Sequence, residues 1–154
     1  MKIKVLMVCL GNICRSPLAE GILQSKVDPE QVFVDSAGTG DWHVGNRPDS
    51  RSIAVAQKYG LDISSQHCRQ FTTTDFDEFD LIYVMDKSNF RNVMAKARNA
   101  ADSSIIKLLL SESDTSETEV PDPYHDSENG FDKVYHMIDQ ACDKIANKLV
   151  HNIN

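Results

Sequence analysis

The sequence predicts an α/β fold: a single three-layer domain over residues 1–154, with a four-stranded parallel sheet and helices on both faces. Three observations support this prediction. Apolar runs of strand length alternate four times with apolar residues at helical spacing, which is the pattern of a sheet built from strand–helix units. The first run, Val5–Val8, contains no polar residue, as expected for a strand buried on both faces. The chain of 154 residues is long enough for one domain with a core, but not for two.

Two strands and two helices are predicted in the first half of the chain. The strand at 5–8 leads through a short loop to a serine and a proline at 16–17, which read as an N-cap followed by a first helical residue. The next strand is expected at 32–34 and ends at the segment 35–38. An aspartate at the start and a glycine just past the end predict a second helix over 49–59.

Two further strands and two further helices are predicted in the second half. The segment 62–79 is polar, and its structure is left open. Asp86 or Ser88 is expected to cap the helix that follows the third strand. The elements predicted from apolar runs and helical spacing are strands at 81–85 and 105–110, a helix with apolar residues from 90 to 97, and a final helix at 129–150.

Composition and charge limit the classes of partner. The net charge of −7 argues against nucleic acids and anionic membrane surfaces. The sequence has no predicted signal peptide and no apolar run long enough to span a bilayer. Its four cysteines have neither the density of a disulfide scaffold nor the spacing of a zinc site. We therefore expect a cytoplasmic, reducing setting.

The segment from the first strand to residues 16–17 predicts an anion-binding loop with a nucleophile. A strand that runs through a tight loop into a helix N-terminus points backbone N–H groups and the positive end of the helix dipole at one spot. Cys9 and Arg15 bracket this spot, and the arginine fork matches two oxygens of a tetrahedral oxyanion. Gly11 permits a close backbone approach, and Asn12 tolerates a left-handed conformation. These neighbours favour the thiolate of Cys9, whereas the alternative is an inert cysteine at a strand end.

Three side chains at predicted strand ends are expected to meet at one edge of the sheet. Cys9, Ser36 and Asp86 each follow or end an apolar run. In open parallel sheets the ligand binds outside the carboxyl ends of the strands. Asp86 either caps the next helix or orients Arg15, and both interpretations stay open.

Asp122 is the candidate general acid. A thiolate that attacks a phosphate ester must expel an alkoxide or phenoxide, and protonation of that group lowers the barrier. Pro121 and Pro123 flank Asp122, and the second proline keeps the aspartate backbone out of the helical region. Such stiffness suits a carboxylate that must be held in one place. The alternative is an ordinary turn with a surface aspartate.

Four motifs then point to a known family. They are Cys-Leu-Gly-Asn-Ile-Cys-Arg-Ser-Pro at 9–17, Asp-Ser-Ala-Gly-Thr at 35–39, Val-Met-Asp at 84–86 with Ser-Asn at 88–89, and Asp-Pro-Tyr at 122–124. In this order they resemble the low-molecular-weight protein tyrosine phosphatases, over essentially the whole chain. The resemblance implies that Cys9 becomes a phosphocysteine, that Arg15 binds the phosphoryl oxygens, and that Asp122 protonates the leaving group and then activates water. It implies no metal and no cofactor.

The resemblance also implies supporting roles. The phosphate-binding loop comprises Leu10, Gly11, Asn12, Ile13, Cys14 and Ser16, and the Ser16 hydroxyl stabilises the Cys9 thiolate. Residues that hold the loop in shape are Ser36, His67 and Asp86. The walls of a slot for a flat phosphoaryl group are Ile13, Trp42 and Tyr124. The alternatives are a polar loop histidine for His67 and core packing for Trp42. His125 follows Tyr124 where many members of the family carry a second tyrosine.

The implied function is hydrolysis of phosphotyrosine in a protein or peptide, and of small aryl phosphates, by a monomer or weak homodimer. Cys14 is implied to form a reversible disulfide with Cys9, although it can also be read as a small buried residue. A second interpretation is arsenate reductase, which needs a relay of further cysteines for which Cys68 is a lone candidate. A third is a non-catalytic phosphopeptide-binding module, which the presence of both a nucleophile and an acid disfavours.

Overall fold

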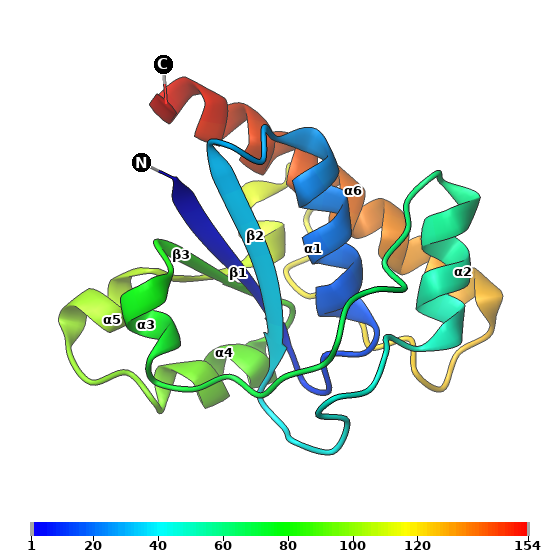
Figure 1. The fold of residues 1–154 in the computed structure, drawn as a ribbon, viewed down its shortest axis with the longest axis horizontal. Coiled ribbons are helices and arrows are strands. Elements are labelled where there is room, and N and C mark those ends of the chain that lie inside the picture. The colour runs from blue at the N-terminus through cyan, green and yellow to red at the C-terminus, as the bar shows by residue number, and fades with distance from the viewer. Residues whose placement is uncertain (1, 154) are drawn as a thin grey trace.

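The computed structural model describes residues 2–153. The core of the fold is a sheet of four strands that pair only in parallel, in the order β2-β1-β3-β4 (Figure 1). The strands are β1 (Ile3–Cys9), β2 (Val32–Gly38), β3 (Leu81–Val84) and β4 (Ile106–Leu108). The predicted α/β class and four-stranded parallel sheet are confirmed.

Helices cover both faces of the sheet and complete the three layers (Figure 1). They are α1 (Arg15–Lys26), α2 (Ser50–Lys58), α3 (Asp75–Glu78), α4 (Lys87–Met94), α5 (Ala100–Ser104) and α6 (Glu128–Ile153), with the 3₁₀ turn η1 (Leu109–Glu112) after β4. Helices α1 and α6 pack together on one face, with α2 beside them, whereas α3, α4 and α5 lie on the other.

The central strand β1 contributes to both layers of the core. Val5 and Met7 point into the cluster beneath α1 and α6, whereas Leu6 and Val8 point into the cluster with α3 and α4. All four side chains are fully buried. Burial of one such side chain contributes about 1.5–3 kcal/mol relative to exposure, so both faces of this strand help to fix its register. The uninterrupted apolar run at 5–8 follows from this double burial.

Several predicted helix ends are confirmed. The Asp49 carboxylate accepts a hydrogen bond of 2.8 Å from the backbone N–H of Arg51 and so caps α2. Gly60, with a φ of +86°, follows the C-cap of that helix. Asp86, and not Ser88, caps α4 by accepting from the backbone N–H of Asn89 at 2.8 Å.

The predicted cap at Ser16 is wrong. Helix α1 already begins at Arg15, and its N-cap is Cys14, which makes no side-chain capping bond. The Ser16 hydroxyl instead lies 3.0 Å from Cys9 Sγ. The Ser-Pro pair is typical of a helix start, but here the serine hydroxyl contacts the Cys9 sulfur and does not cap the helix.

The predicted strand at 105–110 is shorter than expected. Strand β4 covers only Ile106–Leu108, and the chain then enters η1. Leu109 and Leu110 are buried in the cluster that includes α6, so their apolar character reflects packing on a helix and not a longer strand. Two short helices, α3 and α5, were not predicted. They have four and five residues, too few to show a helical period.

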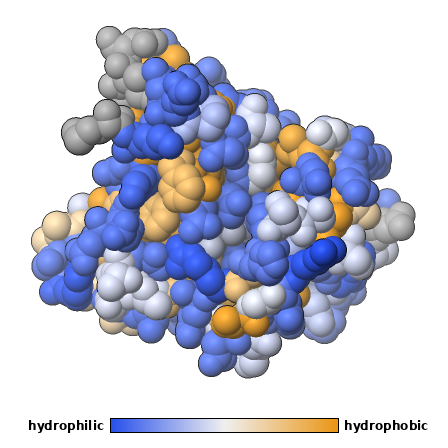
Figure 2. All heavy atoms as spheres, in the orientation of Figure 1, coloured by the Kyte–Doolittle hydropathy of each residue, from blue (hydrophilic) through white to orange (hydrophobic). Residues whose placement is uncertain are grey.

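One face of the molecule is largely polar. Figure 2 shows a mainly hydrophilic face with apolar atoms in small separate groups. Within residues 2–153, no helix is both long enough and apolar enough to cross a membrane.

Candidate active site

A pocket of about 260 Å³ lies at the carboxyl ends of the strands. Strand β1 lies between β2 and β3, so the strand order reverses its direction next to β1. In such sheets ligands bind at this point, outside the carboxyl ends of the strands, and the loop that follows β1 lies there. The residues that line the pocket are Cys9, Leu10, Gly11, Ile13, Cys14, Arg15, Trp42, His43, Asp122, Tyr124 and His125. Most of the predicted site residues therefore meet in one pocket.

Cys9 lies at the inner end of this pocket. It is the last residue of β1, and only 2% of its surface is exposed. Two groups of Ser16 approach its sulfur: the hydroxyl oxygen at 3.0 Å and the backbone N–H at 3.4 Å. Both contacts favour a negative charge on the sulfur.

The loop between Cys9 and α1 presents free backbone donors. Within the described part of the chain, the N–H groups of residues 11–15 donate no hydrogen bond to the protein. They lie directly before α1 and at its first residue, where the helix dipole adds partial positive charge. Unpaired N–H groups at such a position form a site for a tetrahedral anion.

Arg15 reaches the same pocket from the first turn of α1. Its Nη1 donates to Asp86 Oδ2 at 2.6 Å and to the carbonyl of Val120 at 2.9 Å. Among the described residues, its Nε and Nη2 have no hydrogen-bond partner. Burial lowers the pKa of Arg15, but the negative charges at Cys9 and Asp86 outweigh it and the pKa is raised. The guanidinium therefore keeps its charge and two unused donor nitrogens beside the loop. The interpretation that Asp86 orients Arg15 fits this pair, and Asp86 caps α4 as well.

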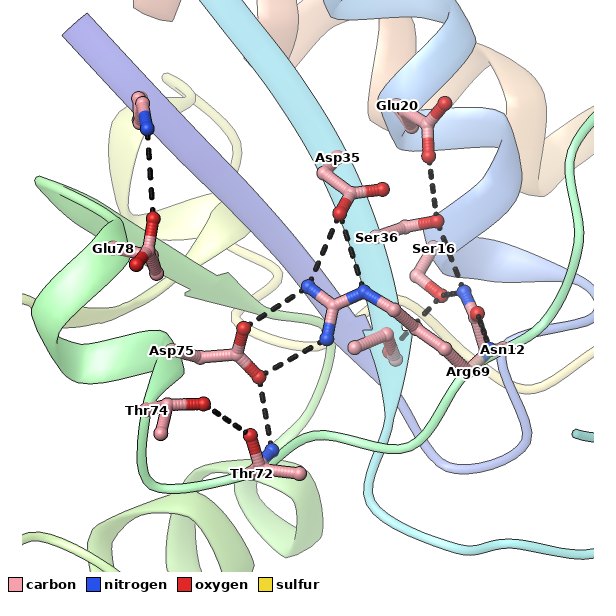
Figure 3. Close-up of polar contacts among 12 residues, drawn as sticks. Asn12, Ser16, Glu20, Asp35, Ser36, Arg69, Thr72, Thr74, Asp75 and Glu78 are labelled. Carbon is pink, nitrogen blue, oxygen red and sulfur yellow. Dashed lines mark hydrogen bonds and ion pairs between the residues drawn. The ribbon is translucent and has the colours of Figure 1, made fainter.

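Asn12 holds the loop in a left-handed turn, with a φ of +57°. Its amide nitrogen donates to the hydroxyls of Ser16 and Ser36 at 2.8 and 3.0 Å (Figure 3). Its amide oxygen accepts from the backbone N–H of Arg69 at 3.0 Å, which fixes the orientation of the amide. Because Ser16 Oγ accepts a hydrogen bond from the Asn12 amide, the Ser16 hydroxyl can direct its own hydrogen toward Cys9 Sγ. The network thus ends in a donor at the sulfur.

Ser36 extends this network to a carboxyl group. It accepts from Asn12 and donates to Glu20 Oε1 at 2.8 Å (Figure 3). Burial raises the pKa of Glu20 to about 7; the nearby Asp35 acts in the same direction, while the Ser36 hydrogen bond and Arg69 oppose it. The predicted placement of Ser36 beside the loop agrees with this geometry.

The segment at Cys68 and Arg69 is a support that the sequence analysis missed. Cys68 Sγ donates to the carbonyl of Asn12 at 2.8 Å, and the Arg69 N–H binds the Asn12 side chain. The Arg69 guanidinium is held by Asp35 and Asp75 (Figure 3). Gly38 lies between this segment and the loop: it pairs with Gln70, and a Cβ on it would lie only 2.8 Å from the Leu10 carbonyl. No local sequence pattern marks these contacts, since they join residues more than 50 positions apart.

His67 is not part of this network, contrary to the prediction. Its side chain is exposed, and in residues 2–153 it makes no hydrogen bond to the loop or its supports. The expected partners are used by other groups, because Glu20 binds Ser36 and Asp35 binds Arg69. The prediction found the right segment of the chain but assigned the role to the wrong residue.

Asp122 and two aromatic side chains form the mouth of the pocket. The Asp122 side chain is 46% exposed, and its Oδ2 lies 3.9 Å from Arg15 Nη2. Its Oδ1 accepts from the backbone N–H of Tyr124 at 3.0 Å, which restricts the carboxylate. Trp42 is 67% exposed and Tyr124 is 42% exposed, so the alternative of core packing for Trp42 is wrong. His43 also lines the pocket, although nothing in its sequence context had marked it.

Cys14 differs in environment from Cys9. Burial, together with the charges of Asp49 and Cys9, raises the pKa of Cys14 to about 12. Cys14 is therefore a neutral thiol near pH 7, and it is also a buried residue of the pocket wall. In the described part of the chain, no group of three or more His, Cys, Asp or Glu side chains is placed to hold a metal ion.

Comparisons with known proteins agree with this geometry. A sequence profile of the family described as low molecular weight phosphotyrosine protein phosphatase matches residues 4–154. The protein of that name from Schizosaccharomyces pombe is 42% identical over 139 residues, which cover 86% of this chain and 88% of the relative. The low molecular weight protein-tyrosine-phosphatase YfkJ of Bacillus subtilis is 37% identical, with 93% of each chain covered.

Solved structures give the same result. A protein tyrosine phosphatase from Entamoeba histolytica, with Hepes in its active site, superposes with a TM-score of 0.93 at 33% identity, covering 99% of this chain and 100% of the other. The crystal structure of YfkJ from Bacillus subtilis gives a TM-score of 0.91 at 34% identity, covering 100% and 98%. The chain therefore belongs to the low molecular weight phosphotyrosine protein phosphatase family.

Proposed function

We propose that the protein is a protein tyrosine phosphatase that hydrolyses phosphotyrosine and small aryl phosphates through a phosphocysteine on Cys9. The observation that carries the proposal is the pocket itself: a sulfur that accepts hydrogen bonds, a ring of unused N–H groups and two free donor nitrogens of Arg15 surround one space. Phosphate oxygens would satisfy these donors and bring the phosphorus next to the sulfur.

In the first step the Cys9 thiolate attacks the phosphorus and forms the S–P bond. The P–O bond to the phenol breaks, and the departing oxygen takes a proton from the Asp122 carboxyl group. Charge that develops on the equatorial oxygens is stabilised by the N–H groups of residues 11–15 and by Arg15. Asp86 and the Val120 carbonyl support this role, because they hold the guanidinium by one nitrogen and leave the others to the substrate.

In the second step water replaces Cys9 at the phosphorus. The Asp122 carboxylate, which gave up its proton in the first step, takes one from the water as it attacks. The S–P bond breaks, inorganic phosphate leaves, and the Cys9 thiolate is restored. The two Ser16 donors stabilise this leaving thiolate as they stabilise the attacking one.

The mouth of the pocket supports a preference for aromatic phosphate esters. Cys9 is almost fully buried, so the phosphate must enter the pocket to reach it. Ile13, Trp42 and Tyr124 line the path, and their apolar surfaces suit a flat ring that follows the phosphate. A phosphoserine side chain has no ring to fill this space.

Hydrolysis of peptides tests the proposal directly. We expect the purified protein to release phosphate from phosphotyrosine peptides in the presence of a chelator, and to act on the matched phosphoserine peptides at least about 100-fold more slowly in kcat/KM. Equal rates on both peptides would contradict an aromatic slot. Absence of hydrolysis on every aryl phosphate would contradict the enzyme assignment.

We further propose that Cys14 protects Cys9 from irreversible oxidation. Peroxide converts the Cys9 thiolate to a sulfenic acid, and condensation with the Cys14 thiol forms the disulfide and releases water. The raised pKa of Cys14 keeps it a neutral thiol, so that the oxidant reacts first at Cys9. Both cysteines are free and line the same pocket, which supports this pairing.

Replacement of Cys14 by serine tests the protective role. After brief peroxide treatment followed by dithiothreitol, we expect the wild-type protein to regain most of its activity and Cys14→Ser to regain little, because its sulfenic acid is oxidised further. Mass spectrometry of the oxidised wild-type protein checks for the Cys9–Cys14 linkage. Equal recovery of both proteins would contradict a role for Cys14.

The two other functions suggested by the sequence gain no support. Cys68, the candidate relay for arsenate reduction, is buried and donates to the Asn12 carbonyl, and burial raises its pKa to about 11. Cys142 lies on α6 and is fully buried in the core. A non-catalytic phosphopeptide module would not need both Cys9 and Asp122 at one pocket.

The proposal includes a phosphotyrosine protein or peptide as substrate, a monomer or weak homodimer as the active form, and a cytoplasmic location. The four free cysteines support a reducing compartment. The net charge of −7 gives no support for nucleic acids or anionic lipids as partners.

A further inference from the structure

We propose that Arg51 is a positioning residue: it holds the segment that carries Asp122 at a fixed place relative to the phosphate-binding loop. This inference rests on the proposed function, because Arg51 acts only through the general acid. It does not touch the space where the phosphate binds, since it is absent from the pocket lining.

Arg51 binds the backbone on the far side of the acid. Its Nη2 donates to the carbonyl of Tyr124 at 2.8 Å, and its Nη1 donates to the carbonyl of Asp126 at 3.1 Å. Its guanidinium carbon also lies 5.6 Å from the centre of the Tyr124 ring and 4.6 Å from that of Phe131 in α6. One side chain therefore holds two peptide groups and one wall of the substrate slot.

The acid segment has few other fixed points. Residues 121–126 lie between η1 and α6 and contain no helix or strand. Among the described groups, the two bonds from Arg51 are the only hydrogen bonds that join this segment to another element. The remaining bonds, such as Tyr124 N–H to Asp122 Oδ1, are internal. A segment with so few ties moves readily unless these hold.

Asp49 connects Arg51 to the phosphate-binding loop. Its carboxylate accepts from the backbone N–H, Nε and Nη2 of Arg51, and these hydrogen bonds lower the pKa of Asp49. The Asp49 backbone N–H in turn donates to the carbonyl of Ile13 at 2.8 Å. A continuous path thus runs from Ile13 through Asp49 and Arg51 to Tyr124, two residues beyond the acid. Because each link is short, the path fixes the distance between nucleophile loop and acid.

The planar fork of arginine is needed for this path. Nε and Nη2 of the Arg51 guanidinium donate to Asp49, while Nη2 also donates to the carbonyl of Tyr124 and Nη1 donates to that of Asp126. A lysine ammonium is a point charge and cannot bind both sides with the same geometry. A methionine keeps much of the length and apolar contact but makes none of these hydrogen bonds.

Leaving-group dependence separates a role through Asp122 from a structural one. We expect Arg51→Met to lower kcat/KM for phenyl phosphate by about tenfold, and for p-nitrophenyl phosphate by about twofold, because the better leaving group needs less protonation. Arg51→Lys should recover part of the loss. Lys58→Met is the matched control: Lys58 ties the same helix to Asp132 of α6 at 2.9 Å but does not touch the acid segment. It should change neither substrate's rate.

A double variant completes the test. In an Asp122→Ala background, Arg51→Met should cause no further loss, since the group that it positions is gone. Equal losses on both substrates, or an undiminished loss in the Asp122→Ala background, would overturn the positioning role. Failure of the proposed function is distinct: the wild-type protein would then hydrolyse neither aryl phosphate, or Asp122→Ala alone would show no leaving-group dependence.

Discussion

Cys9→Ser is expected to reduce hydrolysis of p-nitrophenyl phosphate on the order of 10⁴-fold or more, the size of loss that follows removal of a covalent nucleophile. A serine hydroxyl at this position has the same contacts to Ser16 but stays protonated near pH 7, so it cannot attack. The change is isosteric, and we expect the free energy of unfolding to change by less than about 1 kcal/mol. Steady-state kinetics and thermal unfolding measure the two quantities.

Cys142→Ala serves as the control for Cys9→Ser. This cysteine lies on the buried face of α6 and does not line the pocket. The variant should lose about 1 kcal/mol of stability through a small cavity and should keep its turnover at 25 °C. If Cys9→Ser retains wild-type turnover, the covalent mechanism is wrong, whatever the control shows.

Asp122→Ala is expected to lower kcat/KM for phenyl phosphate by about 10²- to 10³-fold, and by distinctly less for p-nitrophenyl phosphate. The poorer leaving group requires the proton that Asp122 supplies, whereas the better one departs with little help. Because the Asp122 side chain is 46% exposed, the substitution should have little effect on stability. Kinetics on a series of substituted phenyl phosphates gives the leaving-group dependence.

Glu117→Gln is a matched control in the same loop. Glu117 is exposed and, among the described side chains, forms no ion pair. Its replacement should leave both substrates unaffected. Loss of activity in Asp122→Ala that is the same for every leaving group would argue against Asp122 as the proton donor and for a purely structural effect.

The fold was predictable because its determinants are local and repeated. Each strand of the sheet is a short apolar run, and the helix ends at Asp49, Gly60 and Asp86 carry recognisable caps. The errors occurred where a local pattern had two physical causes. The leucines at 109–110 looked like strand residues but are apolar because they pack in the cluster with α6. Ser16 has the sequence of a cap, yet its hydroxyl is used at Cys9.

The nucleophile and the phosphate-binding loop were predictable to a similar degree. Cys9, Arg15 and the loop between them lie within seven consecutive residues, so their proximity follows from the chain itself. The flanking prolines made Asp122 a candidate, but its place at the site, like that of Trp42, rested on the family resemblance, because no local rule brings distant loops to one pocket. The geometry then placed both at the pocket lining.

The support around the loop was only partly predictable. The Asn12 side chain forms hydrogen bonds with Ser16, Ser36 and Arg69, and Arg69 is 57 positions away in the sequence. His67 was assigned from the family resemblance, whereas the contacts to Asn12 come from its neighbours Cys68 and Arg69. A hydrogen bond from a backbone N–H, such as that of Arg69, cannot be predicted from residue type, because every residue except proline carries the same donor.

The same reason explains why Arg51 was missed. Its partners on the acid segment are carbonyl groups of Tyr124 and Asp126, which any residue provides. Only Asp49, two positions before it, is a partner that the sequence could suggest. The sequence therefore predicts the reacting groups better than the groups that hold them in place.

Direct detection of the phosphoenzyme tests the central claim, that Cys9 carries the phosphoryl group. Asp122→Ala, which lacks the base for the second step, should accumulate this species when mixed with p-nitrophenyl phosphate and quenched within milliseconds to seconds. Mass spectrometry of the digested protein is expected to find one phosphate on the peptide that contains Cys9, and none when Cys9 is serine. A phosphate on another residue, or product release without any phosphoenzyme, would contradict the account.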